Sequence, residues 1–176
     1  MIKWPNLPED VRVKRLMPPS KRPVPVVMDT DTYNEIDDQF AVAYAQLSPQ
    51  IDLRAVYAAP FFNGRSSDPA DGMEKSYQEL LRLLKLMDKS PEGFAFSGSD
   101  RFMASYEDAV DSPAVRDLIA KALAMPEDEP LYVLTIGCPV NVSSALLIEP
   151  KLVEKIVVVW LGGNATQAWH EAWEFN

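Results

Sequence analysis

The sequence predicts an α/β fold with a mostly parallel β-sheet that is covered by helices on both faces. Three observations support this fold class. Short apolar runs alternate with longer runs of helical periodicity along most of the chain. The short runs are nearly uniformly apolar, which is typical of strands buried on both faces. Finally, 176 residues with 47% hydrophobic and 24% charged side chains suit one compact domain.

The predicted elements follow one another in β-α-β-α order, the order of a Rossmann-like fold. Residues 1–23 contain several prolines and scattered basic residues, so we expect an irregular arm with one helical turn around Pro8 to Leu16. The α/β domain is then expected to cover residues 24–176. The predicted strands are Val24–Met28, Leu53–Ala59, Leu131–Thr135 and Ile156–Leu161, and the predicted helices are Asp38–Leu47, Ala70–Met87, Pro113–Ala124 and Val140–Ile148.

Local signals justify several of these elements. Along the helix over 70–87, one face carries an apolar stripe at helical spacing, made of Met73, Tyr77, Leu80, Leu81 and Leu84. Ser112 followed by Pro113 is an N-cap with proline at the first helical position. The last strand is apolar throughout, as burial on both faces requires. Because open α/β sheets bind ligands outside the carboxyl ends of their strands, we expect the functional groups there.

The charge and the cysteine content exclude some partners. Acidic residues outnumber basic ones 26 to 17, and a net charge of -9 would repel phosphate backbones, so no nucleic acid partner is expected. The single cysteine, Cys138, cannot form an internal disulfide. No stretch approaches the ~18 apolar residues of a membrane span, and the first residues lack the apolar run of a signal peptide. We therefore expect a cytoplasmic protein without a membrane partner.

Four aspartates gather where the first strand leads into the next helix. Asp29 and Asp31 end the strand, and Asp37 and Asp38 begin the helix. Four such charges repel one another by amounts of kcal/mol even at an effective dielectric of ~20, so the cluster needs a cation, protonation or wide separation in water. An all-oxygen cluster favours Ca²⁺, with Mg²⁺ second because it keeps more of its waters. Helix capping by Asp37 and solvation of the rest is the alternative.

These residues also resemble the signature of a known family. Asp29-Thr-Asp31 followed by Asp37-Asp38 is similar to the Asp-x-Asp-Pro-Gly-x-Asp-Asp string of the inosine-uridine nucleoside N-ribohydrolases, the nucleoside hydrolases. The resemblance extends from Val24 to Asn176 through further motifs in the family's order, namely Asn63, Gly137-Cys-Pro-Val-Asn141, Trp160-Leu-Gly-Gly163 and Glu174-Phe-Asn176. The spacer Thr32–Ile36 is two residues longer than the usual one and lacks its glycine, which indicates a divergent branch.

The resemblance implies a role for each matched position. Asp31 and Asp38 would be metal ligands, together with the main-chain carbonyl of Ile136, and Asp31 would also deprotonate the attacking water. Asp29 would support the cluster. The residues that would bind the ribosyl group are Asp37, Asn63, Glu174 and Asn176. His170 is a candidate acid for the leaving base. Without the family, Asn63 reads as a turn residue and His170 as a surface histidine.

The implied activity is hydrolysis of the N-glycosidic bond of ribonucleosides, or of a related ribosyl compound, by a metal-activated water. A small-molecule nucleoside or ribosyl compound is then the expected partner. Family members are longer, so the resemblance also implies that the carboxyl-terminal part of the fold, with a further metal-ligating aspartate, is missing. A sheet edge and apolar helix faces would lack their usual cover, and we expect a homo-oligomer or association with the missing half.

Two alternatives remain open at this point. Asp29-Thr-Asp31-Thr32 also fits the Asp-x-Asp-x-Thr pattern of haloacid-dehalogenase-like phosphatases, with Asp29 as nucleophile and Asp31 as acid/base. That pattern explains neither Asp37-Asp38 nor the terminal Glu-Phe-Asn. The chain could also be a non-catalytic fragment that binds sugar or metal.

Overall fold

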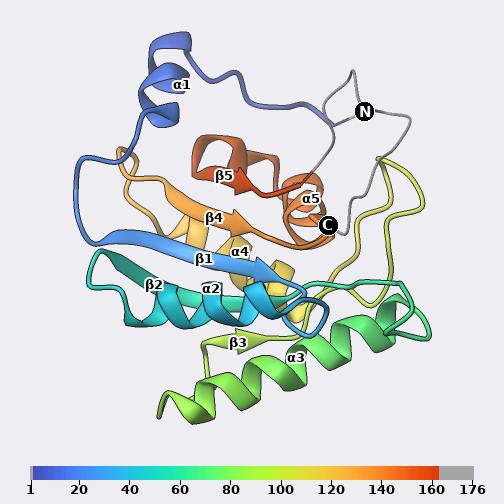
Figure 1. The fold of residues 1–176 in the computed structure, drawn as a ribbon. Coiled ribbons are helices and arrows are strands. Elements are labelled where there is room, and N and C mark those ends of the chain that lie inside the picture. Colours follow the sequence, from blue (N-terminus) through green and yellow to red (C-terminus); the bar gives the residue numbers. More distant parts are fainter. Residues whose placement is uncertain (1, 163–176) are drawn as a thin grey trace, which may run out of the picture.

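The computed structural model describes residues 2–162, and its centre is a five-stranded, all-parallel sheet (Figure 1). The strands are β1 (Val24–Thr30), β2 (Ile51–Ala58), β3 (Ala95–Phe96), β4 (Leu131–Thr135) and β5 (Ile156–Trp160). The helices are α1 (Glu9–Leu16), α2 (Ile36–Leu47), α3 (Pro69–Leu86), α4 (Pro113–Leu123), α5 (Val140–Ile148) and the 3₁₀ helix η1 (Pro150–Glu154). Within residues 2–162, none of the helices has the length and apolar character that crossing a bilayer demands.

The strand order is β3-β2-β1-β4-β5. Strands β2 and β3 therefore extend the sheet on one side of β1, and β4 and β5 extend it on the other side. This arrangement confirms the predicted α/β class with parallel strands. It also creates a topological switch point between β1 and β4, where the connections leave the sheet towards opposite faces. In open α/β sheets, ligands bind in the crevice outside the carboxyl ends of the strands at such a point.

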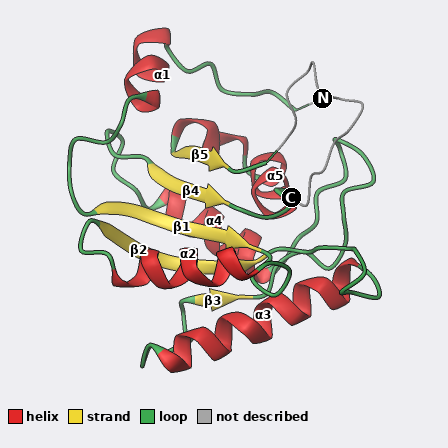
Figure 2. Ribbon diagram, viewed as in Figure 1, coloured by secondary structure: helices red, strands yellow, loops and turns green. Residues whose placement is uncertain are grey.

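Helices cover both faces of the sheet, and each face has its own hydrophobic core. Figure 2 shows α2 and α3 in front of the strands and α4 and α5 behind them. Successive residues of β1 alternate between the two cores: Val27 packs with side chains of α4 and α5, and Met28 packs with those of α2 and α3. Continued alternation directs Asp29 towards α5 and Thr30 towards α2, which their hydrogen bonds confirm.

Several helix starts follow from local chemistry. The side chain of Ser112 accepts a hydrogen bond from the Val115 N–H, which confirms the predicted N-cap of α4. Asp68 does the same for α3 by accepting from the Asp71 N–H at 2.8 Å. Helix α2 begins at Ile36, two residues before the predicted start. Its first turn therefore contains Asp37 and Asp38, two of the four aspartates of the cluster.

The structure contains elements that the periodicity did not predict. Strand β3 has only two residues, too few for any repeating pattern, and η1 is a single short 3₁₀ segment. Helix α1 is longer than the one turn expected in the amino-terminal arm, and it has no buried residue. The guanidinium of Arg15 in α1 donates to the main-chain oxygens of Glu127 and Glu154, so side-chain contacts join the helix to the domain.

Candidate metal and sugar site

The predicted acidic cluster lies at the switch point of the sheet. Asp29 is the penultimate residue of β1, and it pairs in register with Thr135 at the end of β4. Asp31 follows directly after β1, and Asp38 lies in the first turn of α2. All three aspartates are at most 4% exposed. The main-chain N–H of Ile136 donates to the Asp29 carbonyl at 2.9 Å, which brings the end of β4 beside them.

Asp29 is held by an asparagine from α5. Asn141 Nδ2 donates to Asp29 Oδ1 at 2.8 Å and to the Ala58 carbonyl at 3.1 Å. Asn141 Oδ1 accepts from the N–H and the hydroxyl of Ser99, each at 2.8 Å. A Cβ at Gly98 would lie 2.5 Å from Asn141 Nδ2, so only glycine allows the loop after β3 to approach this closely. Asn141 thereby joins the carboxyl ends of β1 and β2 to that loop.

Asp31 has one bound and one free carboxylate oxygen. Its Oδ2 accepts from Asn34 Nδ2 at 2.9 Å, and its main-chain oxygen accepts from the Asn34 N–H at 2.6 Å. Its Oδ1 has no hydrogen-bond partner among the described residues. A Cβ at position 137 would lie 2.9 Å from this Oδ1 and from the Asp31 nitrogen. Gly137 therefore leaves the space beside the free oxygen empty.

Asp38 is bound through two buried threonines. Thr30 Oγ1 donates to Asp38 Oδ1 at 2.6 Å and lies 3.0 Å from Thr32 Oγ1. Because Asp38 is in the first turn of α2, the unpaired amide groups at the helix start also favour its negative charge. The side chain is thus placed by the strand on one side and by its own helix on the other.

Two further acids lie next to Asp38. Carboxylate oxygens of Glu35, Asp37 and Asp38 all fall within 4.8 Å of one another. Asp37 is exposed, Glu35 is half-buried and Asp38 is buried, so the group extends from the interior to the surface. The alternative in which Asp37 caps the helix is wrong, because the N-cap residue is Glu35 and no side chain caps this helix.

Asn63 joins the cluster from the neighbouring strand. It lies in the loop after β2, and its Nδ2 donates to Asn34 Oδ1 at 2.7 Å. Its Oδ1 accepts from the main-chain N–H of Arg65 at 2.9 Å. The guanidinium of Arg65 in turn donates to the Asn34 carbonyl. A chain of amide hydrogen bonds therefore runs from Asn63 through Asn34 to Asp31.

Burial makes the charged forms of three aspartates unfavourable. It raises the pKa of Asp29 to about 7, although the hydrogen bond from Asn141 opposes the shift. Burial likewise raises the pKa of Asp31 to about 6 against the hydrogen bond from Asn34, and that of Asp38 to about 7 against Thr30. Repulsion among the carboxylates adds to each shift. Without a cation, the interior therefore favours protonation of these groups.

The donor set fits a hard divalent cation. Among the described residues, three buried oxygens at this corner have no hydrogen-bond partner, namely Asp29 Oδ2, Asp31 Oδ1 and Thr135 Oγ1. Unsatisfied buried polar atoms are rare in native proteins and cost about 1–3 kcal/mol each, so such a group of them calls for an explanation. A divalent ion would accept oxygen ligands and offset the mutual repulsion of the carboxylates. All the oxygens are hard donors, with no sulfur or imidazole among them.

The structure brings together most of the residues that the sequence selected. Asp29, Asp31, Asp37, Asp38, Asn63 and Ile136 all lie at the carboxyl end of the sheet. His170, Glu174 and Asn176 lie outside the described residues. Sequence reasoning missed the part played by Asn34, because an asparagine in a loop reads only as a turn residue.

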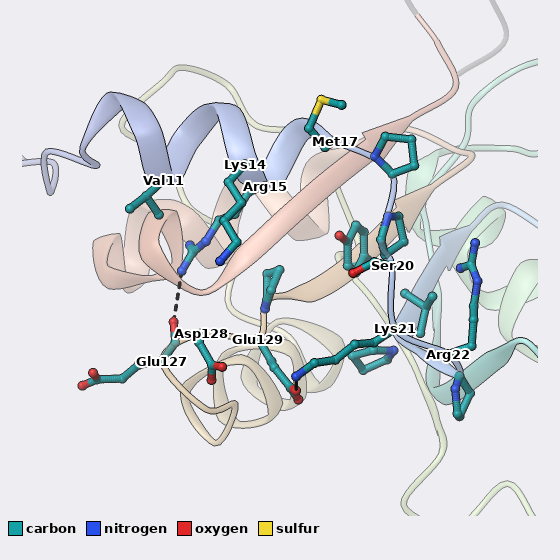
Figure 3. A pocket seen from close by; sticks show the side chains of 17 residues that line it. Val11, Lys14, Arg15, Met17, Ser20, Lys21, Arg22, Glu127, Asp128 and Glu129 are labelled. Carbon is teal, nitrogen blue, oxygen red and sulfur yellow. Dashed lines mark hydrogen bonds and ion pairs between the residues drawn. The ribbon is translucent and has the colours of Figure 1, made fainter.

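A pocket of about 900 Å³ lies at the opposite end of the sheet (Figure 3). It is bounded by the arm and by the loop before β4, and its lining includes Val24 and Tyr132 at the amino ends of β1 and β4. The acidic cluster is not part of it.

Comparison with known proteins identifies the class of fold first. The chain superposes on a solved inosine-guanosine nucleoside hydrolase with a TM-score of 0.60 and 14% sequence identity, over 85% of this chain and 51% of that one. It thus has the α/β fold of a nucleoside hydrolase, as the motifs predicted. The search against family models gave no match.

Curated sequences then supply the particular relatives. The chain is 27% identical to the pyrimidine-specific ribonucleoside hydrolase RihA of Escherichia coli O81 (strain ED1a), over 87% of this chain and 53% of the relative. RihA of Escherichia coli O9:H4 (strain HS) is 26% identical over the same shares. The chain is thus similar to ribonucleoside hydrolases, and it spans about half the length of the curated relatives it matches.

The phosphatase alternative receives no support from these relatives. The geometry also opposes it, because Asp29 would be the nucleophile. That side chain is fully buried, and one of its oxygens is held by Asn141. A nucleophile has to reach the substrate, and the hydrogen bond from Asn141 directs one of the two Asp29 oxygens towards α5 instead.

Proposed function

We propose that this protein hydrolyses the N-glycosidic bond of ribonucleosides or of a closely related ribosyl compound. One observation carries the proposal: a group of buried, incompletely paired carboxylates lies at the switch point of a nucleoside hydrolase fold. Ligands in open α/β sheets bind at that position. The relation to ribonucleoside hydrolases of Escherichia coli supports the same reaction class.

We assign the cation to Asp31, Asp38 and the main-chain carbonyl of Ile136, with Ca²⁺ preferred over Mg²⁺. The free Oδ1 of Asp31, beside the space left by Gly137, supports this assignment. When bound, a divalent cation would lower the pKa of a coordinated water and so ease the loss of its proton to a neighbouring base. Ca²⁺ tolerates the high and irregular coordination that carboxylates and main-chain carbonyls offer, whereas Mg²⁺ keeps more of its waters.

The chain's own residues would perform the remaining tasks. Asp31 would accept the proton of the attacking water, and Asp29 would support it from behind. The buried carboxylates would stabilise the positive charge that develops on the ribosyl group as the glycosidic bond breaks. Asp37 is exposed and Asn63 half-buried at the rim of the cluster, where they could bind sugar hydroxyls.

The proposal gives further tasks to residues outside the described part of the chain. Glu174 and Asn176 would complete the contacts to the sugar, and His170 would protonate the leaving base. The substrate is proposed only as a class, because the relatives differ in the base they are named for: RihA is pyrimidine-specific, and the solved structure is an inosine-guanosine hydrolase.

Release of ribose from nucleosides tests this function. The purified chain is incubated with uridine, cytidine and inosine, with Ca²⁺ or with a chelator, and reducing sugar is measured. We expect ribose release that requires the cation and that the Asp31→Asn variant lacks. Phosphate release from p-nitrophenyl phosphate, without ribose release from any nucleoside, would instead support the phosphatase alternative.

We also propose that the protein associates with another chain, either as a homo-oligomer or with the part of the fold that its relatives contain in addition. One face of α2 carries four large apolar side chains that are 69–71% exposed: Ile36, Phe40, Tyr44 and Leu47. Exposed apolar patches of this kind mark interaction sites. Strand β5, at the edge of the described sheet, adds the exposed Val159 and Trp160. Sedimentation velocity of the chain, with Phe40→Ser as comparison, measures the association directly.

A cytoplasmic location and a single domain over residues 24–176 complete the proposal. The single cysteine, Cys138, is a free thiol, which fits a reducing compartment. Fractionation of cells that express the protein tests the location. Limited proteolysis tests the domain, with cleavage expected between α1 and β1.

A further inference from the structure

We propose that Asn34 is a positioning residue that couples cation binding at Asp31 to sugar binding at Asn63. The inference rests on the proposed function, because it takes Asp31 as a metal ligand and Asn63 as a sugar contact. It goes further by assigning a role to a residue in the spacer Thr32–Ile36, the segment that departs from the family string. The role follows from the hydrogen bonds of this one side chain.

Asn34 is 1% exposed, and its main chain and side chain are both engaged. Its Nδ2 donates to Asp31 Oδ2 at 2.9 Å, and its Oδ1 accepts from Asn63 Nδ2 at 2.7 Å. Its N–H donates to the Asp31 carbonyl at 2.6 Å, and its carbonyl accepts from the Arg65 guanidinium. Asn34 thus contacts the end of β1 and the loop after β2 at the same time.

These contacts determine which atoms of Asp31 and Asn63 remain available to a ligand. Asp31 uses Oδ2 for Asn34, which leaves Oδ1 as the oxygen available to a cation. Asn63 uses one hydrogen of Nδ2 for Asn34, and its Oδ1 accepts from the Arg65 N–H. The second hydrogen of that Nδ2 is therefore the group that it can offer to a sugar hydroxyl.

The polarity of the chain explains why the two sites should communicate. A carboxylate can only accept, so Asp31 fixes the amide of Asn34 with its nitrogen inward and its oxygen towards Asn63. Hydrogen bonds in series polarise and order one another in a low dielectric. A cation bound to Oδ1 would restrict the motion of the Asp31 carboxylate. Through the hydrogen bonds of Asn34, the side chain of Asn63 would then be restricted as well. Asn141 binds Asp29 in a similar way, but its other contacts are Ser99 and Ala58 rather than Asn63.

Calorimetric titration of the full 176-residue chain tests the coupling. D-ribose is titrated with and without saturating CaCl₂, and the coupling is the ratio of the two affinities. For the unchanged chain we expect Ca²⁺ to strengthen ribose binding at least ~5-fold, the lower end of typical coupling between sites. For Asn34→Ala and the nearly isosteric Asn34→Asp we expect a ratio close to one, because neither variant can donate to Asp31.

Two further variants separate positioning from general loosening of the loop. Asn63→Ala should weaken ribose binding while leaving the affinity for Ca²⁺ in the absence of sugar unchanged. Ser66→Ala removes two hydrogen bonds of the same loop, one to the Phe61 carbonyl and one from the Asn63 main-chain N–H. It leaves the side-chain contacts of Asn34 and Asn63 in place, and it should keep the full coupling. Loss of coupling in Ser66→Ala as well would assign the effect to the loop and overturn the role of Asn34.

The outcomes distinguish the inference from the function on which it rests. If the unchanged chain binds neither CaCl₂ nor ribose, the proposed function falls and the inference falls with it. If it binds both with coupling, and both variants of Asn34 keep that coupling, the inference alone is overturned. Binding of both ligands without any coupling in the unchanged chain also overturns it.

Discussion

The two ends of the parallel sheet use charged residues in different ways. At the carboxyl end, Asp29, Asp31 and Asp38 are buried, and burial raises their pKa values. Asp29 and Asp31 each also have one carboxylate oxygen without a hydrogen-bond partner among the described residues. At the amino end, Lys21 pairs with Glu129 while both side chains remain 40–76% exposed. Charge at the carboxyl end is therefore buried at an energetic cost, whereas charge at the amino end stays in contact with water.

The difference between the two ends of the sheet indicates which structural feature marks a functional site. The cavity at the amino end is large, about 900 Å³, but its charged groups are satisfied by ion pairing or solvent (Figure 3). At the carboxyl end the structure keeps acidic groups where they destabilise one another. Such an arrangement persists only if something compensates for it, and protonation or the proposed cation would do so. A cluster of buried acidic side chains without a balancing positive charge is therefore more informative than cavity volume.

Among the substitutions at the two ends of the sheet, replacement of Asp31 should reduce Ca²⁺ affinity and ribose release the most. Asp31→Asn keeps the size of the side chain but removes the charge and the free carboxylate oxygen. Removing outer-shell partners of metal ligands already costs about 10–100-fold in affinity, so loss of a ligand should weaken Ca²⁺ binding by more than ~100-fold. Ribose release should fall with it. Calorimetry and a reducing-sugar assay measure both effects.

The matched control for this variant is Asp128→Asn, which changes an acid that lines the amino-end pocket. It should leave Ca²⁺ affinity and ribose release unchanged. If Asp128→Asn and Asp31→Asn weakened Ca²⁺ binding equally, the cation would be bound by general negative charge, and the contrast between the two ends would be lost.

The stability of the metal-free protein should decrease as the pH rises. Asp29, Asp31 and Asp38 have folded pKa values of about 7, 6 and 7, above the unfolded value of 3.8. Protonation therefore stabilises the fold fully below pH ~4, and this contribution is lost as the pH rises through about 6 to 7. We expect Tm at pH 8 to lie roughly 5 °C or more below Tm at pH 5, since 1 kcal/mol corresponds to about 2–4 °C at this size.

Added Ca²⁺ should reverse this trend, because it binds the ionised carboxylates of the folded chain only. Differential scanning calorimetry at both pH values, with a chelator or with CaCl₂, measures the effect. A metal-free protein that is more stable at pH 8 than at pH 5 would contradict the assignment of these three groups as buried acids without a balancing positive charge.

A smaller and more local effect is expected at Gly137. A Cβ there would lie 2.9 Å from Asp31 Oδ1, so Gly137→Ala should displace the carboxylate or the strand end. Overpacking of this kind costs about 1–3 kcal/mol in stability, and Ca²⁺ affinity should fall as well. Gly64→Ala is the control, since no atom lies within 4 Å of the added carbon. Equal loss of Ca²⁺ affinity in both variants would show that the space beside Asp31 is unimportant.

The smallest effect is expected at the amino end. Lys21→Ala breaks the exposed pair with Glu129, and exposed pairs contribute little because water and salt screen them. We expect no measurable change in Tm, in Ca²⁺ affinity or in ribose release. A clear loss of ribose release would mean that the amino end takes part in function and that the comparison is wrong.

The sequence was sufficient to predict the fold class and the placement of the acidic cluster. Apolar runs such as Leu131–Thr135 predict buried strands, and parallel strands put their carboxyl ends at one edge. The aspartates after β1 were therefore predictable as a group. Their degree of burial was not, because it depends on how closely Gly98 and Gly137 let distant loops approach.

The hydrogen-bond partners of the cluster could not be predicted for the same reason. Asn141 lies 112 positions from Asp29, and Asn63 lies 29 positions from Asn34, so no local pattern links them. Strand β3 was missed because two residues show no periodicity, although its loop supplies Ser99 to the network. Short elements and long-range amide contacts are set by packing rather than by propensity.

The most direct test is calorimetric titration of the metal-free, unchanged chain with CaCl₂ at pH 7.5, beside the same titration with MgCl₂. We expect saturable binding of about one Ca²⁺ per chain with a Kd below ~1 mM, and weaker binding of Mg²⁺, as an oxygen-ligand site of this kind implies. No binding of either ion up to ~10 mM, well above the weak end of protein Ca²⁺ sites, would contradict the assignment of the carboxyl end as a cation site.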